Sequence, residues 1–290
     1  MTQDDKSRYI LRELSRLAKV SALSINELRV VLALERVVAR IEAHKGLRDK
    51  LVFKGGFVLL KSFGSQRFTR DLDALAQDIP KQRLITRVTE ALARDLDDGL
   101  YFGEVAVEDL IDQGQYGGYR IKIPFQIGPL PKEARKLRKL SRVHVDVGFG
   151  DVILGKPKVA KVSSIVEGEP PLSWRIYPLE SIFAEKLETL VSRGSGNSRA
   201  KDLFDLVILF NEVRARRTLK GAITKTFSNR ETDMPTSFAE FFKGLDITIL
   251  ERSWGSVELT GGKMSFASCQ RRLGVVLRGI DKLLAAKRRS

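Results

Sequence analysis

The spacing of apolar residues changes twice along the 290-residue chain, and this change limits the folds that the chain can adopt. Residues 8–20 and 24–43 carry apolar side chains at helical spacing, and that spacing returns from residue 178 onward. Between residues 51 and 149, short alternating stretches are typical of strands, with a helix expected over 81–96. The pattern predicts an α/β (α+β) protein with a small mixed sheet, N-terminal helices around it and a helical C-terminal lobe.

Turn and cap residues place the individual elements. Strands are expected at 51–53, 67–74, 101–107, 119–126 and 143–149. Further helices are expected at 57–63, 178–191, 199–213 and 238–242, with a long basic helix after residue 264. Because a stretch bearing Gly, Lys and Pro interrupts the pattern from 150 to 171, we expect two domains, 1–160 and 161–290.

Basic residues outnumber acidic ones by 51 to 36, which gives a formal charge of +15 and a pI near 10.0. Such an excess favours polyanionic partners such as RNA, DNA or nucleotides. Two short stretches hold many of these charges: Lys132, Arg135, Lys136, Arg138, Lys139 and Arg142, and then Arg271, Arg272, Arg278, Lys282, Lys287, Arg288 and Arg289. Solvated helix faces would explain both stretches equally well.

The composition argues against a disulfide-bonded protein, a zinc protein and a membrane protein. Cys269 is the single cysteine, so no intramolecular disulfide can form, and two histidines with one cysteine cannot build a dedicated zinc site without several carboxylates. The longest apolar runs are far too short for a bilayer span, and the first residues lack the pattern of a signal peptide. We therefore expect a cytoplasmic protein that does not associate with membranes.

In the expected strand 67–74, alternation places Thr69, Asp71 and Asp73 on one face. Two neighbouring carboxylates repel each other unless a cation lies between them. Two Mg²⁺ ions, about 3.5 to 4 Å apart in phosphoryl-transfer sites, would relieve that repulsion and polarise a triphosphate. The alternative is an exposed sheet edge where the two acids form salt bridges to neighbouring arginines.

A third carboxylate is expected on another strand. Residues 143–149 alternate in the same way and place Asp146 on the polar face. In a two-metal site such a residue completes one ion or activates the attacking hydroxyl. Asp146 is equally consistent with an ordinary outward residue of a half-buried strand.

A glycine pair lies between the expected strand at 51–53 and the helix after it. Lys54, Gly55 and Gly56 would let a phosphate approach the backbone N–H groups at the start of the helix. No Gly-Lys-Ser/Thr follows, so this is not a Walker A loop. Without the carboxylates downstream, the same residues would indicate only a turn.

In the C-terminal half, charged residues occur within apolar helices. Lys186 lies beside an apolar stripe, and Asp205 lies in a segment that is apolar almost all round, three residues after Asp202. A buried carboxylate needs a partner. The simplest interpretation is a salt bridge from Lys186 to Asp205 that joins two helices.

Four blocks together resemble the AbiEii/AbiGii-type nucleotidyltransferase toxins, over about residues 50–210. They are Phe53-Lys54-Gly55-Gly56, Arg67-Phe68-Thr69-Arg70-Asp71-Leu72-Asp73, Glu185-Lys186-Leu187 and Lys201-Asp202-Leu203-Phe204-Asp205-Leu206. The combination is specific, although each block alone is not. The resemblance implies a polymerase-β-like nucleotidyltransferase core, a helical C-terminal lobe, and the toxin of a bacterial toxin–antitoxin pair with a cognate antitoxin.

The resemblance also implies roles for individual residues. By position, Asp71 and Asp73 become ligands of Mg²⁺, Asp146 matches a third acidic strand more loosely, and Asp205 or Asp202 becomes an active-site acid. The candidates for nucleotide binding are Lys54, Gly55, Gly56, Ser65, Arg67, Thr69 and Lys186. The wider superfamily often has Gly-Ser where this chain has Gly55-Gly56, and Gly64-Ser65 lies closer to the carboxylates, so either dipeptide is a candidate for the triphosphate.

Our main interpretation is transfer of a nucleoside monophosphate from an NTP to an RNA 3′ end, notably the acceptor stem of tRNA, which would block translation. The basic stretch 132–142 would then bind the RNA. We also hypothesise that phosphorylation of Thr69 silences the enzyme. One rival is a polymerase-β-like transferase that modifies a protein or small molecule, and another is a basic RNA-binding protein without catalysis.

Overall fold

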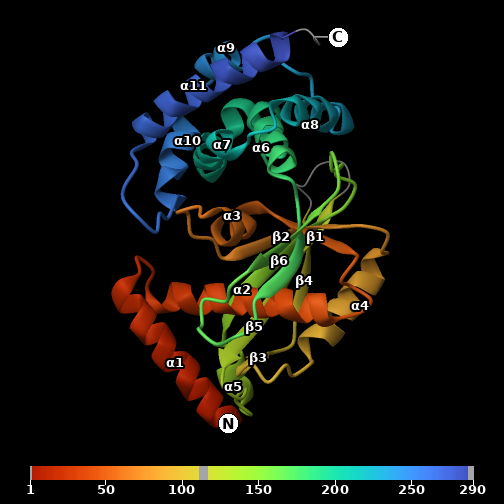
Figure 1. Cartoon of the computed structure of the whole chain (residues 1–290), viewed down its shortest axis with the longest axis vertical. Coiled ribbons are helices and arrows are strands. Elements are labelled where there is room, and N and C mark those ends of the chain that lie inside the picture. Colours follow the sequence, from red (N-terminus) through yellow and green to blue (C-terminus); the bar gives the residue numbers. More distant parts are fainter. Residues whose placement is uncertain (1, 111–116, 287–290) are drawn as a thin grey trace. The chain divides into compact units, whose positions relative to one another are not determined.

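The structure, a computed structural model, describes residues 2–110 and 117–286. Lys287, Arg288 and Arg289 of the C-terminal basic stretch lie outside the described residues. The chain forms two units, which are described separately below (Figure 1). Unit 1 comprises residues 1–64, 68–150 and 158–176, and unit 2 comprises residues 65–67, 151–157 and 177–290.

Unit 1 is built on a mixed sheet, which has eight strands in the described part of the chain. The strands are β1 (Leu51–Lys54), β2 (Asp71–Ala76), β3 (Leu100–Phe102), β4 (Ala106–Leu110), β5 (Gly118–Ile127), β6 (Ser141–Gly148), β7 (Lys158–Val162) and β8 (Leu172–Ile176). Their order is β3-β5-β6-β2-β1-β8-β7, and β4 also pairs with β5. β2 therefore lies between β1, to which it is antiparallel, and β6, to which it is parallel.

Helices surround this sheet (Figure 1). They are α1 (Gln3–Val20), α2 (Ile25–Ala43), α3 (Gly55–Phe63), α4 (Lys81–Leu92) and the short α5 (Ala134–Leu137). The start of α2 follows from its sequence, because Ser24 and Glu27 form the expected capping box, with Ser24 Oγ accepting from Glu27 N at 3.3 Å. Most of α2 is buried, and it packs against β6, β8 and α4.

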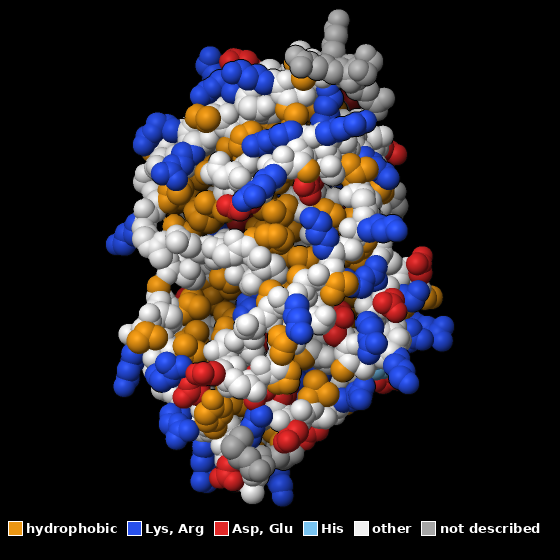
Figure 2. All heavy atoms as spheres, viewed as in Figure 1, with side chains coloured by type: hydrophobic (Ala, Val, Ile, Leu, Met, Phe, Trp, Pro, Cys, Tyr) orange, Lys and Arg blue, Asp and Glu red, His pale blue; other side chains and the backbone are white. Residues whose placement is uncertain are grey.

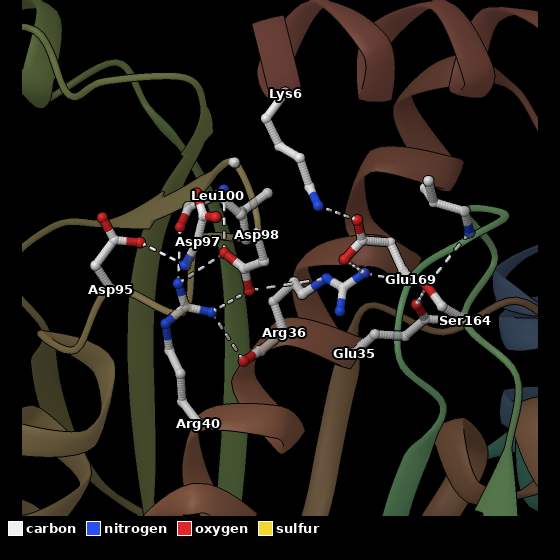
Figure 3. Close-up of polar contacts among 12 residues, drawn as sticks. Lys6, Glu35, Arg36, Arg40, Asp95, Asp97, Asp98, Leu100, Ser164 and Glu169 are labelled. Carbon is white, nitrogen blue, oxygen red and sulfur yellow. Dashed lines mark hydrogen bonds and ion pairs between the residues drawn. The ribbon is translucent and has the colours of Figure 1, made fainter. Parts of the chain in front are cut away.

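Buried ion pairs connect the N-terminal helices of unit 1 to its loops (Figure 3). Arg40 of α2 donates two hydrogen bonds to Asp98, at 2.7 and 3.0 Å. Glu169, between β7 and β8, pairs with Lys6 of α1 at 2.6 Å and with Arg36 of α2 at 3.2 Å. These charges are compensated within the network, so the helices have a structural role here.

Unit 2 is helical. Its α-helices in the described residues are α6 (Leu179–Arg193), α7 (Ala200–Glu212), α8 (Arg216–Asn229), α9 (Phe238–Lys243), α10 (Thr248–Arg252) and α11 (Phe266–Ala285). α6 packs against α7 and α8, and α11 packs against α7 and α9. Residues 65–67 join this unit through Gln66, whose carbonyl accepts from Thr260 N at 2.6 Å. Within the described part of the chain, each helix is too short or too polar to cross a lipid bilayer.

The structure differs from the sequence-based expectation in several places. The expected boundary at residue 160 falls inside β7, and the sheet continues through β8 to residue 176. The strand expected at 67–74 begins only at Asp71, because Arg67 belongs to unit 2. The segments that form α8 and α10 had no predicted helix, and one expected strand at 101–107 is two, β3 and β4.

Candidate active site

Two rows of polar side chains cross one face of the sheet in unit 1. The first row runs through β1, β2, β6 and β5 and consists of Lys54, Asp73, Asp146 and Arg120. The second row runs through β2, β6 and β5 and consists of Asp71, His144 and Lys122. Residues paired across neighbouring strands project from the same face, so these rows bring the carboxylates of two strands together.

Asp71 and Asp73 both reach solvent from this face. In β2 they alternate with the buried Leu72 and Ala74, which anchor the strand in the core. The side chain of Asp71 is 36% exposed, and its Oδ1 lies 3.0 Å from Nδ1 of His144. Asp73 is half-buried. Both carboxylates are therefore placed where a ligand from solvent can meet them.

The carboxylate of Asp73 packs against the first residue of α3. Gly55 has a φ of 77°, and a Cβ placed on it would lie 1.9 Å from Oδ2 of Asp73. Lys54, the N-cap residue, makes no side-chain capping bond in this helix. The N-terminus of α3 thus faces an anion, which its backbone dipoles stabilise. Gly64-Ser65, by contrast, lies at the other end of α3, where Gly64 is the C-cap with a φ of 63°.

Asp146 is not free. Its side chain is 7% exposed, and both oxygens accept hydrogen bonds from Arg120, at 2.8 Å from Nε and 2.7 Å from Nη2. These hydrogen bonds raise the pKa of Arg120 above its ordinary value against the effect of burial, and the charges of Asp71 and Asp73 add to the shift. The guanidinium therefore lies within the field of three carboxylates.

A metal ion fits part of this face. Carboxylate oxygens are the ligands that Mg²⁺ prefers, and Asp71 and Asp73 offer them beside each other. Asp146, the predicted third ligand, has both of its oxygens bonded to Arg120 in this structure, and its role as a metal ligand stays a prediction. Accordingly, no three His, Cys, Asp or Glu side chains among the described residues are grouped so that they could hold a metal.

Two predicted nucleotide contacts before β2 form hydrogen bonds to the backbone. Ser65, 7% exposed, accepts from Arg67 N at 3.3 Å through its hydroxyl. Thr69, also 7% exposed, bonds through Oγ1 to the backbone N and O of Asp71, both at 3.3 Å. Thr69 precedes β2 rather than lying in it. These bonds shape the chain that leads to the acidic pair.

The remaining candidates form a buried charge cluster in unit 2. Lys186 of α6 pairs with Asp202 at 2.5 Å and with Asp205 at 2.9 Å, both on α7. Arg67 donates to both oxygens of Asp205 at 2.8 Å, and Arg199 lies 2.6 Å from Asp202. The predicted salt bridge from Lys186 to Asp205 is confirmed, and it joins α6 to α7.

These contacts hold the cluster in its charged form. Burial would lower the pKa of Lys186, but Asp202 and Asp205 outweigh it and raise the pKa above the ordinary value. Burial would raise the pKa of Asp205, but Arg67 and Lys186 hold it below its usual range, and Lys186 and Arg199 do the same for Asp202. Both oxygens of Asp205 are engaged and its side chain is fully buried, so it acts here as an ion-pair partner.

A comparison with known protein families identifies the family of the chain. Residues 36–258 match the family described as Nucleotidyl transferase AbiEii toxin, Type IV TA system, which covers more than half of the chain. The chain belongs to the AbiEii family. It is thus a member of a family of nucleotidyltransferase toxins of type IV toxin–antitoxin systems, and the resemblance of the four blocks is confirmed.

Solved structures share the fold of this AbiEii protein. JHP933 from Helicobacter pylori is 19% identical with a TM-score of 0.55, covering 90% of this chain and 94% of its own. MenT4, a nucleotidyltransferase toxin from Mycobacterium tuberculosis H37Rv, is 16% identical with a TM-score of 0.60, covering 99% and 91%. At such identities the likeness concerns the fold, and it confirms the predicted fold class. No curated protein sequence matches the chain.

The sequence analysis missed three cations and a histidine, of which Arg120, Lys122 and His144 lie on the sheet face of unit 1 and Arg199 lies in the charge cluster of unit 2. Arg120 and Lys122 lie on the polar face of β5, and the alternation of that strand could have revealed them. His144 lies two residues before Asp146 in the same alternating strand. Arg199 lies three residues before Asp202, a spacing that brings side chains together at the start of a helix.

Proposed function

We propose that this AbiEii protein transfers a nucleoside monophosphate from an NTP to the 3′ hydroxyl of an RNA. The hydroxyl oxygen attacks the α-phosphorus, and pyrophosphate leaves. The acceptor end of tRNA is the proposed substrate, and its extension would block translation. The observation that carries the proposal is the register of β2 and β6, which places Asp71, Asp73 and Asp146 on one face of the sheet.

Within this proposal, Asp71 and Asp73 hold Mg²⁺, which when bound polarises the triphosphate and balances the charge of the leaving group. The N-terminus of α3 contributes backbone N–H groups for the phosphates, because Gly55 and Gly56 leave no side chain in the way. We therefore assign the triphosphate to Gly55-Gly56 and not to Gly64-Ser65, which lies at the C-terminal end of the helix.

Lys186 is the proposed phosphate contact of unit 2. Its raised pKa keeps the ammonium charged at neutral pH, as a contact to a triphosphate requires. We assign Asp202 and Asp205 as positioning residues, because their oxygens hold Lys186, Arg67 and Arg199 in place. Charge already fixed in position needs no reorganisation when charge develops in the transition state.

The RNA is proposed to bind the basic stretch 132–142, all six of whose basic residues are exposed (Lys132, Arg135, Lys136, Arg138, Lys139 and Arg142). Figure 2 shows that Lys and Arg side chains are spread widely over the face in view. A cognate antitoxin is the proposed protein partner, since the family belongs to type IV toxin–antitoxin systems. With RNA and NTP as substrates, we place the protein in the cytoplasm.

The test is incorporation of labelled nucleotide. The protein is incubated with each labelled NTP in turn, Mg²⁺ and total bacterial RNA, and the labelled RNA bands are identified. Asp71→Asn should abolish incorporation, because it removes one charge of the acidic pair. Asp109→Asn is the matched control, since Asp109 is an exposed carboxylate on β4 outside the two rows.

Three results would contradict all or part of the proposal. Intact NTP after incubation of the parent protein with RNA would favour a basic RNA-binding protein without catalysis. Parental incorporation by a folded Asp71→Asn variant would remove the acidic pair from the mechanism. Label in a protein or a small molecule, and not in RNA, would keep the transferase but replace the substrate.

A further inference from the structure

Arg120 lies beside Asp146 in the row that also contains Asp73, and it balances part of the negative charge of these two carboxylates. Asp73 and Asp146 are direct neighbours in the register of β2 and β6, and Asp146 is almost fully buried. Two carboxylates so placed repel each other in a medium that screens charge poorly. Arg120, the next residue in the same row, supplies the compensating charge through its bidentate pair with Asp146.

The bidentate pair of Arg120 and Asp146 prevents another cation from binding to Asp146. Both oxygens of Asp146 are taken, so this carboxylate cannot bind a metal ion while Arg120 holds it. Arg120 itself is 32% exposed, which leaves its guanidinium a path toward solvent. The acidic row therefore contains a partly exposed arginine that is bound to one of its carboxylates.

We propose that Arg120 is a built-in counterion that competes with a divalent cation for Asp146, so that the complete acidic site forms only when Arg120 releases this carboxylate. The inference rests on the proposed function, in which Asp71 and Asp73 bind the metal. It adds a step that governs metal affinity. Without the metal Arg120 stabilises the face, and with the metal it moves away.

Lys122 provides a matched control. It lies two residues after Arg120 on the same strand and projects from the same face, but its ion pair is with Glu108 of β4. The Lys122→Gln and Arg120→Gln variants therefore lose the same charge on the same strand. They differ in whether the lost cation was bound to a carboxylate of the acidic row.

The experiment measures Mn²⁺ binding directly, without nucleotide or RNA, by calorimetry or by the electron paramagnetic resonance signal of free Mn²⁺. Arg120→Gln should bind Mn²⁺ more tightly than the parent, on the order of tenfold, because a competing unit charge is gone. Lys122→Gln should bind with an affinity close to that of the parent. Equal tightening in both variants would show that only overall charge matters and would overturn the proposal.

A second measurement covers the case in which Arg120→Gln does not fold. The side-chain Nε–H signal of Arg120 in the parent protein, assigned by its loss in Arg120→Lys, should shift when Mg²⁺ is added. An unchanged signal overturns the proposal. A folded Arg120→Gln variant that binds Mn²⁺ no more tightly than the parent also overturns it, and so does the absence of Mn²⁺ binding in both proteins. Incorporation by the parent is measured on the same preparation, so failure of the proposed function is seen separately.

Discussion

Gly55 shows how one residue fixes the geometry of the acidic pair. Its backbone has a φ of 77°, which side chains on L-residues disfavour, and a Cβ there would collide with the carboxylate of Asp73 at 1.9 Å. Glycine is therefore required for two separate reasons. One concerns the turn between β1 and α3, and the other concerns the position of a proposed metal ligand.

The two reasons can be separated by comparing Gly55→Ala with Gly64→Ala. Gly64 has a φ of 63°, but a Cβ there would meet nothing within 4 Å, so Gly64→Ala adds only backbone strain, about 1 to 2 kcal/mol. Gly55→Ala adds the same strain and also displaces Asp73. We expect both variants to melt earlier and only Gly55→Ala to lose nucleotide transfer, on the order of 10²-fold. Equal transfer by the two folded variants would contradict this.

Whether a site residue could be predicted from the sequence depends on how far apart along the chain the interacting residues lie. Asp71 and Asp73 were predictable because strand alternation is local. The pairing of Asp146 with Arg120 was not, because it depends on the register between β5 and β6, which one sequence does not reveal. The same holds for Arg67, whose partner Asp205 is 138 residues away along the chain.

At the scale of elements, α6 and α7 are joined through Lys186. Removing one member of a buried ion pair leaves an uncompensated charge and costs about 3 to 5 kcal/mol. When Lys186 is removed, Arg67 still holds Asp205 and Arg199 still holds Asp202, so Lys186→Ala should lower the melting temperature by less than the loss of an isolated pair would. Adding Asp205→Ala should lower it further, because the buried Arg67 then loses its partner. Lys201→Ala, a lysine of α7 that is only partly buried, is the control.

Measuring nucleotide transfer by the same variants distinguishes a structural role of Lys186 from a contact to the triphosphate. If Lys186 also contacts the triphosphate, Lys186→Ala should reduce the rate on the order of 10² to 10³ fold, and the double variant should not regain it. Measurements are made below the melting temperature of each variant. A Lys186→Ala protein that melts early but transfers at the parental rate would leave Lys186 a structural role alone.

α2 carries a carboxylate whose position opposes its ionisation. Burial raises the pKa of Glu42 to about 7 from an ordinary value of 4.5, despite the charges of Arg175 and Arg48, and its Oε1 has no hydrogen-bond partner in the described residues. Between about pH 4.5 and about pH 7, Glu42 is therefore protonated in the folded state and ionised in the unfolded state. Stability must fall as the pH rises from about 4.5 to about 7.

Glu42→Gln removes this titration. We expect the variant to melt a few degrees above the parent at about pH 8, since a protein of this size gains about 2 to 4 °C per kcal/mol. Near pH 4 the two proteins should melt at nearly the same temperature, because Glu42 is then largely protonated in both the folded and the unfolded state. Calorimetry at the two pH values checks this, and an equal difference at both would exclude the titration of Glu42 as its cause.

The elements that were predicted and those that were missed differ in physical terms. α2, α6 and α7 were predictable, since each has an apolar stripe at helical spacing or a cap signal. β7 has exposed residues on both faces and α8 begins with basic residues, so neither carries a clear local pattern. Their structure follows from pairing with β8 and packing on α6, which are tertiary contacts.

For the whole molecule, the +15 charge leaves each unit with an exposed basic surface. In unit 1 it is the stretch around α5. In unit 2, Arg271, Arg278 and Lys282 are exposed at helical spacing along α11. The acid among them, Asp281, is turned toward α9, where it accepts hydrogen bonds from Phe238 N and Ser237 Oγ. Either surface has the charge to bind RNA phosphates.

Salt dependence of RNA affinity distinguishes the two surfaces, because each phosphate contact to a single strand releases about 0.7 counterions. Replacing Lys132, Lys136 and Lys139 by alanine should reduce the slope of log K against log salt by about 2, if each contacts one phosphate. Replacing Arg271, Arg278 and Lys282 removes the same charge from α11 and should leave the slope near that of the parent. If the second variant flattens the slope and the first does not, α11 is the RNA interface. If both flatten it equally, the RNA responds to the total charge of the protein, and neither stretch is a specific contact surface.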